Sequence, residues 1–517
     1  MRPCPFDTYQ PSHVHFTIGS MSFPRSLLFL TLVFALFSAM PAIGQGGTPS
    51  LVQYASDMQF TFTMSSGQYM LAYLPNPAGA GNLITACLAA DETGQPTVSD
   101  DKGNTYHLGG TIRDTDNIKD VWCYYAYNVV SGTRQIKVTA NGTTSWSTPV
   151  IAEWTNVLAS SDPLDVSHGA FGPSSTVAAG SVTPNHSGDL VVQFAWNAYA
   201  CCSTPGITWT AGNQSNINWE LWIAENEMAA GAQWGVYNST SPLSATMSDA
   251  GSAVGGATVA MFFQAANAGT PQPAGIQVVG RKTININAAS PFSANPHTMQ
   301  VPCPAYSNLL VVNYASGGED LTGVSSNPSN TWVQAHALVG TGTPRVHNYY
   351  AANATLSPTT TVTLTLGSVS SQSAEIYCVK GAATAPFDVA AVNSAGLQTS
   401  CPGGTCNLNL VTITPTTVNG LILVTGSQEQ NTSNQLVGAS QLWDGCLYSA
   451  ESLSVSGCSQ NNPFGHYLNP NTSSVNFTAT QLSNSLPVQD YVAEADAYKA
   501  AGTTTLQPPT GLTATVQ

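Results

Sequence analysis

Tyr124-Tyr125-Ala126 recurs 225 residues later as Tyr349-Tyr350-Ala351. Three further segments recur with offsets of 226, 226 and 223 residues. They are Asn82-Leu83-Ile84 with Asn308-Leu309-Leu310, Asn104-Thr105-Tyr106 with Asn330-Thr331-Trp332, and Asp162-Pro163-Leu164-Asp165-Val166 with Ala385-Pro386-Phe387-Asp388-Val389. An offset that stays nearly constant over about 80 residues indicates a tandem duplication.

Short apolar runs between turn residues predict that the chain is built from β-strands. Gln135–Ala140 and Thr361–Leu366 alternate with period two, as half-buried antiparallel strands do. Such runs are rich in β-branched and aromatic residues, and Gly, Pro, Asn, Asp and Ser separate them. The predicted fold class is therefore all-β, with tandem antiparallel β-sandwich units, immunoglobulin-like or jelly-roll-like, that are stapled by disulfides.

A weaker repeat inside each copy predicts two units per copy. Gly81-Asn82-Leu83 recurs as Gly188-Asp189-Leu190, and Ser307-Asn308-Leu309 recurs as Asn419-Gly420-Leu421. Each copy is about twice the ~100 residues of an immunoglobulin-type sandwich, so we expect four sandwiches in two pairs. The alternative is two larger jelly-roll-like sandwiches. The predicted boundaries are 47–266 for the first copy (units 47–160 and 161–266), 267–273 for a linker, and 274–500 for the second copy (units 274–382 and 383–500).

The N-terminal segment predicts secretion. An apolar run of 14 residues, Leu27–Met40, follows Arg25 and precedes the small residues Ala42 and Gly44. This run is too short to span a bilayer, which needs about 20 residues. We interpret residues 1–44 as a cleaved signal peptide. The mature chain is then secreted, extracellular or at the cell surface, with no membrane span after cleavage.

The charge balance argues against nucleic acid as a partner. The formal net charge is −15, and charged residues make up 8% of the chain, against about 25% in typical soluble proteins. No run of basic residues is present, so the sequence shows no cluster of positive charge that could bind a phosphate backbone.

Two motifs resemble repeats of secreted, multi-module bacterial surface proteins. They are Val98–Tyr106 and the Tyr-Tyr-Ala-x-Asn strand that ends at Asn128 and again at Asn353. Such proteins often carry immunoglobulin-like and fibronectin type III modules. Gln507–Gln517 resembles the first strand of a fibronectin type III domain, so we assign 501–517 to a linker and such a remnant. The resemblance implies architecture and secretion, but it transfers no catalytic or binding residue.

The cysteines predict disulfides, because ten remain after signal cleavage and an even number in a secreted chain favours pairing. Cys87 and Cys123 have non-cysteine counterparts in the second copy, near Asn313 and Asn348. If the two cysteines form a disulfide, both are expected to be absent together from the second copy. The other candidates are Cys303 with Cys378, Cys401 with Cys406, Cys446 with Cys458, and the adjacent Cys201 and Cys202, which form a vicinal disulfide, pair elsewhere or stay reduced.

Aromatic residues are concentrated in one part of the first copy, and this is the strongest indication of a ligand-binding site in the sequence. The candidate glycan-binding residues are Trp196, Tyr199, Trp209, Trp219 and Trp222, and Trp234 follows in the same stretch. Exposed Trp and Tyr faces stack on the apolar faces of sugar rings, while neutral Asn and Gln side chains supply hydrogen bonds. The alternative is that these rings fill a sandwich core.

Catalytic and metal-binding motifs are weak in this chain. Glu225 and Glu227 follow a Trp-rich strand, but residues i and i+2 of one strand point the same way and do not oppose each other across a substrate. Asp114, Asp116 and Asp120 share the first spacings of a calcium loop, but the residues between them do not fit an EF-hand. We predict no catalytic residue, no metal site and no cofactor.

The sequence therefore favours a secreted non-catalytic surface or matrix protein that mediates adhesion or binds a neutral glycan. Its expected partner is a polysaccharide or another surface protein. One alternative is a secreted carbohydrate-active hydrolase with two carboxyl groups about 5–10 Å apart in a cleft. A second alternative is a structural spacer array, which would show neither such a cleft nor an exposed aromatic platform.

Overall fold

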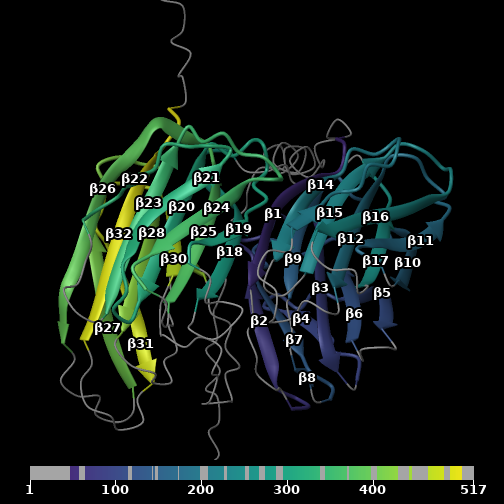
Figure 1. Ribbon diagram of the computed structural model, residues 1–517, viewed down its shortest axis with the longest axis horizontal. Coiled ribbons are helices and arrows are strands. Elements are labelled where there is room, and N and C mark those ends of the chain that lie inside the picture. The colour runs from purple at the N-terminus through teal and green to yellow at the C-terminus, as the bar shows by residue number, and fades with distance from the viewer. Residues whose placement is uncertain are drawn as a thin grey trace, which may run out of the picture. The chain divides into compact units, whose positions relative to one another are not determined.

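β-Strands are the regular secondary structure of the residues that the structure describes, and no helix occurs among them. The computed structural model (Figure 1) describes residues 47–57, 65–92, 94–114, 119–142, 144–145, 149–172, 174–197, 208–225, 230–250, 256–266, 274–286, 295–337, 344–368, 372–397, 405–428, 442–444, 464–482 and 490–502. All of them belong to one compact unit, Gln45–Gln517. The predictions outside these residues concern the signal peptide 1–44, the linker 267–273, residues 503–517 of the tail, Tyr199, Cys201, Cys202, Cys401, Cys446, Cys458 and the side chain of Cys406.

The first group of strands forms two facing sheets. Five strands pair in the order β1 (Ser50–Asp57), β9 (Val150–Thr155), β3 (Leu83–Glu92), β6 (Lys119–Ala126) and β5 (His107–Asp114). Three strands pair in the order β2 (Tyr69–Tyr73), β7 (Gln135–Thr139) and β4 (Thr97–Asp100), while the short β8 (Thr144–Ser145) pairs with β3. Ala72 and Ile136 of the smaller sheet pack on Ile84 and Ala86 of the larger one.

The next two groups repeat this arrangement. In the second group, β10 (Leu164–Gly172), β17 (Gly256–Phe263), β12 (Asp189–Asn197), β15 (Ala230–Tyr237) and β14 (Glu220–Glu225) face β11 (Thr176–Val182), β16 (Leu243–Ala250) and β13 (Thr208–Thr210). In the third, β18 (Gln277–Ile286), β25 (Gln372–Lys380), β20 (Leu309–Ser316), β23 (Arg345–Ala352) and β22 (Val333–Gln334) face β19 (His297–Gln300), β24 (Thr361–Leu366) and β21 (Leu321–Asn327).

The last group has the same order for the strands that are described. These are β26 (Ala382–Leu397), β32 (Asp490–Ala500), β28 (Gly420–Gln428), β30 (Phe464–Asn469) and β29 (Leu442–Asp444), with β27 (Thr405–Ile413) and β31 (Val475–Leu482) in the smaller sheet. In the first group the first strand pairs with the last, β2 with β7 and β3 with β6, all antiparallel. This nesting is jelly-roll-like. The predicted all-β fold of tandem antiparallel sandwich units is confirmed.

The five-stranded sheets are covered on both faces, because two of them pack against each other within each copy. In β3, Leu83 and Cys87 pack against the second group, whereas Ile84 and Ala86 pack against the smaller sheet of their own group. The second copy repeats this contact with apolar residues of β20 and β28 in one cluster. Strands buried on both faces read as continuous apolar runs rather than as alternating ones.

β1 and β18 join the two copies, since they pair in parallel and merge two five-stranded sheets, as Figure 1 shows. Successive residues of a strand point to opposite faces. On β18, the buried Arg281 donates from Nη2 to the Tyr73 carbonyl oxygen at 2.9 Å, and the buried Lys282 donates from Nζ to the Ala224 carbonyl oxygen at 2.7 Å. These side chains therefore connect β18 to both groups of the first copy.

The repeated turn residues have a conformational cause. The Asn that ends each Tyr-Tyr-Ala-x-Asn strand, Asn128 or Asn353, adopts a φ of 50°. Gly81, Gly188 and Asn419, which precede strands in three groups, have φ values of 78°, 89° and 55°. Gly and Asn enter this left-handed region at low cost. The motifs found in the sequence therefore mark sharp turns.

The predicted disulfide between Cys87 and Cys123 is confirmed. These residues lie directly opposite each other on β3 and β6. In the second copy, Asn313 of β20 lies directly opposite Asn348 of β23. An amide pair thus replaces the bonded pair at the matching place, as the comparison of the two copies predicted.

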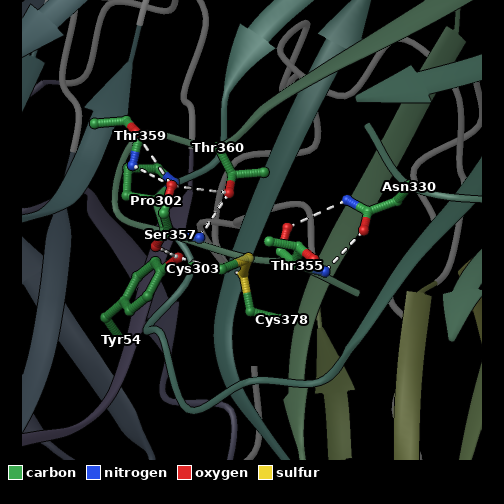
Figure 2. The surroundings of a disulfide bond; sticks show 9 residues. All are labelled: Tyr54, Pro302, Cys303, Asn330, Thr355, Ser357, Thr359, Thr360 and Cys378. Carbon is green, nitrogen blue, oxygen red and sulfur yellow. Dashed lines mark hydrogen bonds between the residues drawn. A yellow bond between two sulfur atoms is a disulfide. The ribbon is translucent and has the colours of Figure 1, made fainter. Parts of the chain in front are cut away.

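The predicted disulfide between Cys303 and Cys378 is also confirmed, and it lies beside the junction of the two copies (Figure 2). It connects the segment after β19 to β25. The Tyr54 hydroxyl group of β1 donates to the Pro302 carbonyl oxygen at 2.6 Å, next to the bond. In β9 of the first copy, Glu153 occupies the position that Cys378 has in β25.

Replacing both Cys303 and Cys378 by Ala is expected to lower the free energy of unfolding by about 2–4 kcal/mol. The bond closes a loop between residues 75 positions apart, and the Cys87–Cys123 bond spans 36. Since each doubling of loop length adds only about 0.6 kcal/mol, the Cys87→Ala, Cys123→Ala variant should lose slightly less stability. Urea denaturation of both variants checks this. Unchanged midpoints would contradict it.

Candidate functional site

Four of the five candidate glycan-binding rings lie in the core. Trp196, Trp209 and Trp222 expose 1% of their surface each, and Trp219 exposes 8%. Tyr199 lies outside the described residues. The expectation that these rings form an exposed platform is therefore corrected for the four tryptophans. Core packing, the alternative interpretation, holds for them.

Trp196 and Trp222 are buried where one five-stranded sheet packs on another, whereas Trp219 is buried between the two sheets of its own group. Trp222 of β14 lies edge-on to Trp154 of β9, with ring centroids 5.8 Å apart, and to Tyr54 of β1 at 6.1 Å. Trp209 of β13 covers Gly231, where an added Cβ atom would come within 2.5 Å of the ring. Gly231 thus leaves the space that this ring fills. A Trp-rich strand alone does not reveal that both faces of its sheet are covered.

Among the described members of this aromatic group, Trp234 of β15 is half-buried rather than buried. Its ring centroid lies 5.6 Å from that of Trp154, so the core holds one side of the ring. The ring also lines a surface pocket of about 380 Å³. The other lining residues are Thr48, Pro49, Asn216, Ile217, Asn218, Glu220, Val236 and Asn238.

The segment before β14 forms one wall of this pocket because β15 carries a glycine beside Trp234. An added Cβ atom at Gly235 would meet Ile217 at 2.6 Å and the Asn218 carbonyl oxygen at 2.8 Å. Asn216 turns the chain with a φ of 70°, and its carbonyl oxygen accepts a hydrogen bond from the Asn238 backbone N–H at 3.4 Å. This arrangement places three asparagines around the edge of one tryptophan.

The pocket combines an aromatic surface with neutral hydrogen-bonding groups. Each Asn amide offers donors and an acceptor, and the Trp ring offers apolar surface. Glu220 lies opposite Trp234 on the neighbouring strand, and burial raises the pKa of its carboxyl group. An uncharged ligand with both hydroxyl groups and apolar C–H faces matches these walls.

A second pocket, of about 270 Å³, lies near the junction of β1, β9 and β18 and includes Gln53, Asn76, Asn82, Glu153 and Gln277. Glu153 accepts hydrogen bonds from Gln53 at 2.5 Å, from Asn82 at 2.6 Å and from the Gly79 backbone at 2.8 Å. Burial nevertheless raises the pKa of Glu153, and these hydrogen bonds partly offset the effect. Most of the polar groups in this pocket are thus engaged with one another.

Each of these two pockets has one carboxyl group among its described lining residues, Glu220 in the first and Glu153 in the second. Glycoside hydrolysis ordinarily uses two. Glu227 and the side chain of Glu225 lie outside the described residues.

The sequence pattern pointed to Trp234, and it missed Asn216, Glu220, Asn238 and Glu153. It also missed a group of potential metal ligands, Asp165, His186 and Asp189. The matched segments of the two copies contained a signal for this group. Asp165 is matched by an aspartate, Asp388, in the second copy, whereas Asp189 is matched by Gly420.

Within the part of the chain that the structure describes, no helix is long and apolar enough to cross a bilayer. Comparison with protein-family models gives no match, and comparison with curated proteins gives none either.

Proposed function

We propose that this chain is a secreted, non-catalytic surface or matrix protein that binds a neutral glycan in the pocket beside Trp234. The observation that carries the proposal is the half-buried Trp234 ring among Asn216, Asn218 and Asn238. Aromatic side chains with a few placed polar groups are the usual lining of small-molecule sites. The pocket volume of about 380 Å³ lies within the usual range of about 300–1,000 Å³.

Two further features support the extracellular part of the proposal. Both disulfides join segments of the sandwiches, and disulfides persist mainly in oxidising compartments. The net charge of −15 disfavours an anionic ligand, whereas a neutral glycan carries no charge to be repelled. Tandem sandwich units are also the architecture of the multi-module bacterial surface proteins that the sequence resembles.

Replacing Trp234 by Ala is expected to weaken retention on the bound polysaccharide by about 30-fold, the effect of losing one aromatic anchor. The measurement is a pull-down of the purified chain on a panel of insoluble polysaccharides. Trp234→Phe, which keeps a ring, should retain much of the binding. Tyr306→Ala removes a 46% exposed ring outside the pocket and should bind like the wild type.

The outcomes of this assay separate the three functions that the sequence suggested. Retention that is equal in wild type and Trp234→Ala would place binding elsewhere and refute the pocket. Retention on none of the polysaccharides would favour adhesion to another protein or a spacer role. Release of soluble sugar would establish a hydrolase.

A further inference from the structure

Three potential metal ligands meet at one end of the second group of strands. β10 and β12 both pair with β17, and Leu164 and Leu190 are both partners of Phe263. Asp165 and Asp189 therefore lie at the same end of the sheet, at the starts of two parallel strands that β17 separates. His186 lies in the turn before β12. One donor atom from each of Asp165, His186 and Asp189 lies within 4.8 Å of the other two.

Asp165 holds the turn between β11 and β12 in place. Its carboxylate accepts hydrogen bonds from the Asn185 backbone N–H at 2.6 Å and from the Asn185 side-chain amide at 2.9 Å. His186 Nδ1 lies 3.0 Å from Asp165 Oδ1. The Asp165 side chain is 2% exposed, whereas that of His186 is 51% exposed. The group is thus buried on one side and open to solvent at the imidazole.

The Asp189 carboxyl group lies beside that of Asp165, and no hydrogen-bond donor among the described residues accounts for its burial. The residue is fully buried, and neither carboxyl oxygen has a hydrogen-bond partner among the described residues. A buried carboxylate without a partner is costly unless it binds a proton or a cation.

The second copy shows which of these residues the turn itself requires. Asp388, the counterpart of Asp165, accepts hydrogen bonds from the backbone N–H groups of Thr416 at 2.8 Å and of Thr417 at 3.2 Å. The side-chain hydroxyl groups of both threonines also donate to it. Gly420 stands in the place of Asp189. In the second copy, one aspartate is therefore sufficient to hold the matching turn.

We propose that Asp165, His186 and Asp189 bind one divalent transition-metal ion, with Zn²⁺ as the best match. One imidazole nitrogen and two carboxylate oxygens are ligands that Zn²⁺ accepts, with water in a fourth position. Ca²⁺ and Mg²⁺ prefer oxygen ligands throughout. Two buried carboxylates supply a charge of −2 to the ion, and the exposed imidazole gives it a path from solvent. This site is independent of the glycan-binding proposal.

Equilibrium dialysis of the purified chain against Zn²⁺, with metal analysis afterwards, tests this proposal. Wild type is expected to retain one more equivalent of Zn²⁺ than either Asp189→Asn or His186→Ala. Asp388→Asn alters the matching turn of the second copy and should retain as much as the wild type. Equal retention by wild type and Asp189→Asn would overturn the proposal, and so would retention of Ca²⁺ in place of Zn²⁺.

Thermal unfolding provides a second readout that does not depend on counting metal. Asp189→Asn keeps the shape of the side chain and removes a buried acid, so the variant should fold. Saturating Zn²⁺ is expected to raise the unfolding temperature of the wild type and to leave that of Asp189→Asn unchanged, because an ion that binds only the folded state stabilises it. Equal shifts in the two proteins would refute the site.

Discussion

Replacing Arg281 by Met should lower the free energy of unfolding by about 3–5 kcal/mol, the usual cost of removing one partner of a buried ion pair. Arg281 and Glu375 both have fully buried side chains, with Arg281 Nη1 3.1 Å from Glu375 Oε1. Nη1 also donates to the Thr283 hydroxyl at 3.1 Å, and Nη2 donates to the Tyr73 carbonyl oxygen at 2.9 Å. The single variant leaves the buried Glu375 carboxylate without its ion-pair partner, with the Thr283 hydroxyl still donating to it at 2.6 Å. Urea denaturation near neutral pH measures the loss.

The matched control is the double variant Arg281→Met, Glu375→Leu. It removes both charges together, and apolar replacement of a whole buried pair is often close to neutral. The double variant should therefore be more stable than Arg281→Met alone. If the two variants have the same midpoint, the cost comes from lost packing at the junction of β1 and β18 rather than from an unpaired charge.

The second large effect is expected from pH, through Asp496 and Glu494 of β32. Both are fully buried between the five-stranded sheets of the second copy. Asn348 Nδ2 donates to Asp496 Oδ2 at 2.9 Å, and the Thr425 hydroxyl donates to Asn348 Oδ1 at 3.1 Å. Neither oxygen of Glu494 has a hydrogen-bond partner among the described residues.

Burial raises the pKa of Asp496 from 3.8 to about 7, although the hydrogen bond from Asn348, the adjacent Glu494 side chain and the nearby His336 oppose the shift. Burial and the charge of Asp496 raise the pKa of Glu494 as well. The folded chain therefore holds protons that the unfolded chain releases near pH 4. Stability from the protonated Asp496 carboxyl group is fully present below about pH 4 and is lost as pH rises to about 7, by up to about 1.4 kcal/mol per pH unit, and Glu494 acts in the same direction.

Urea midpoints of wild type and Asp496→Asn between pH 4.5 and 7.5 test this expectation. Asp189 also has a pKa raised to about 7, so the informative quantity is the difference between the two proteins at each pH. Asp496→Asn should gain stability relative to wild type as pH rises, because the amide never has to ionise. A difference that is the same at every pH would show that Asp496 does not carry a proton in the folded chain.

Local patterns in the sequence determined the all-β fold and much of its detail. The period-two runs identified strands such as Gln135–Thr139, because successive side chains of a strand point to opposite faces. Repeated Asn and Gly residues marked turns with positive φ, because these residue types enter that region at low cost. Joint loss of Cys87 and Cys123 in the second copy identified a bonded pair, since neither cysteine is useful without the other.

Only the tertiary structure decided which of these residues are available for function. Trp196 and Trp222 lie in the core because a second five-stranded sheet covers them, whereas Trp234 reaches a pocket beside Gly235. Asp496 meets Asn348 across 148 positions of sequence. Both depend on how whole sheets pack, and packing partners distant in sequence leave no pattern within a strand. Burial, and with it pKa and ligand access, is a property of these long-range contacts.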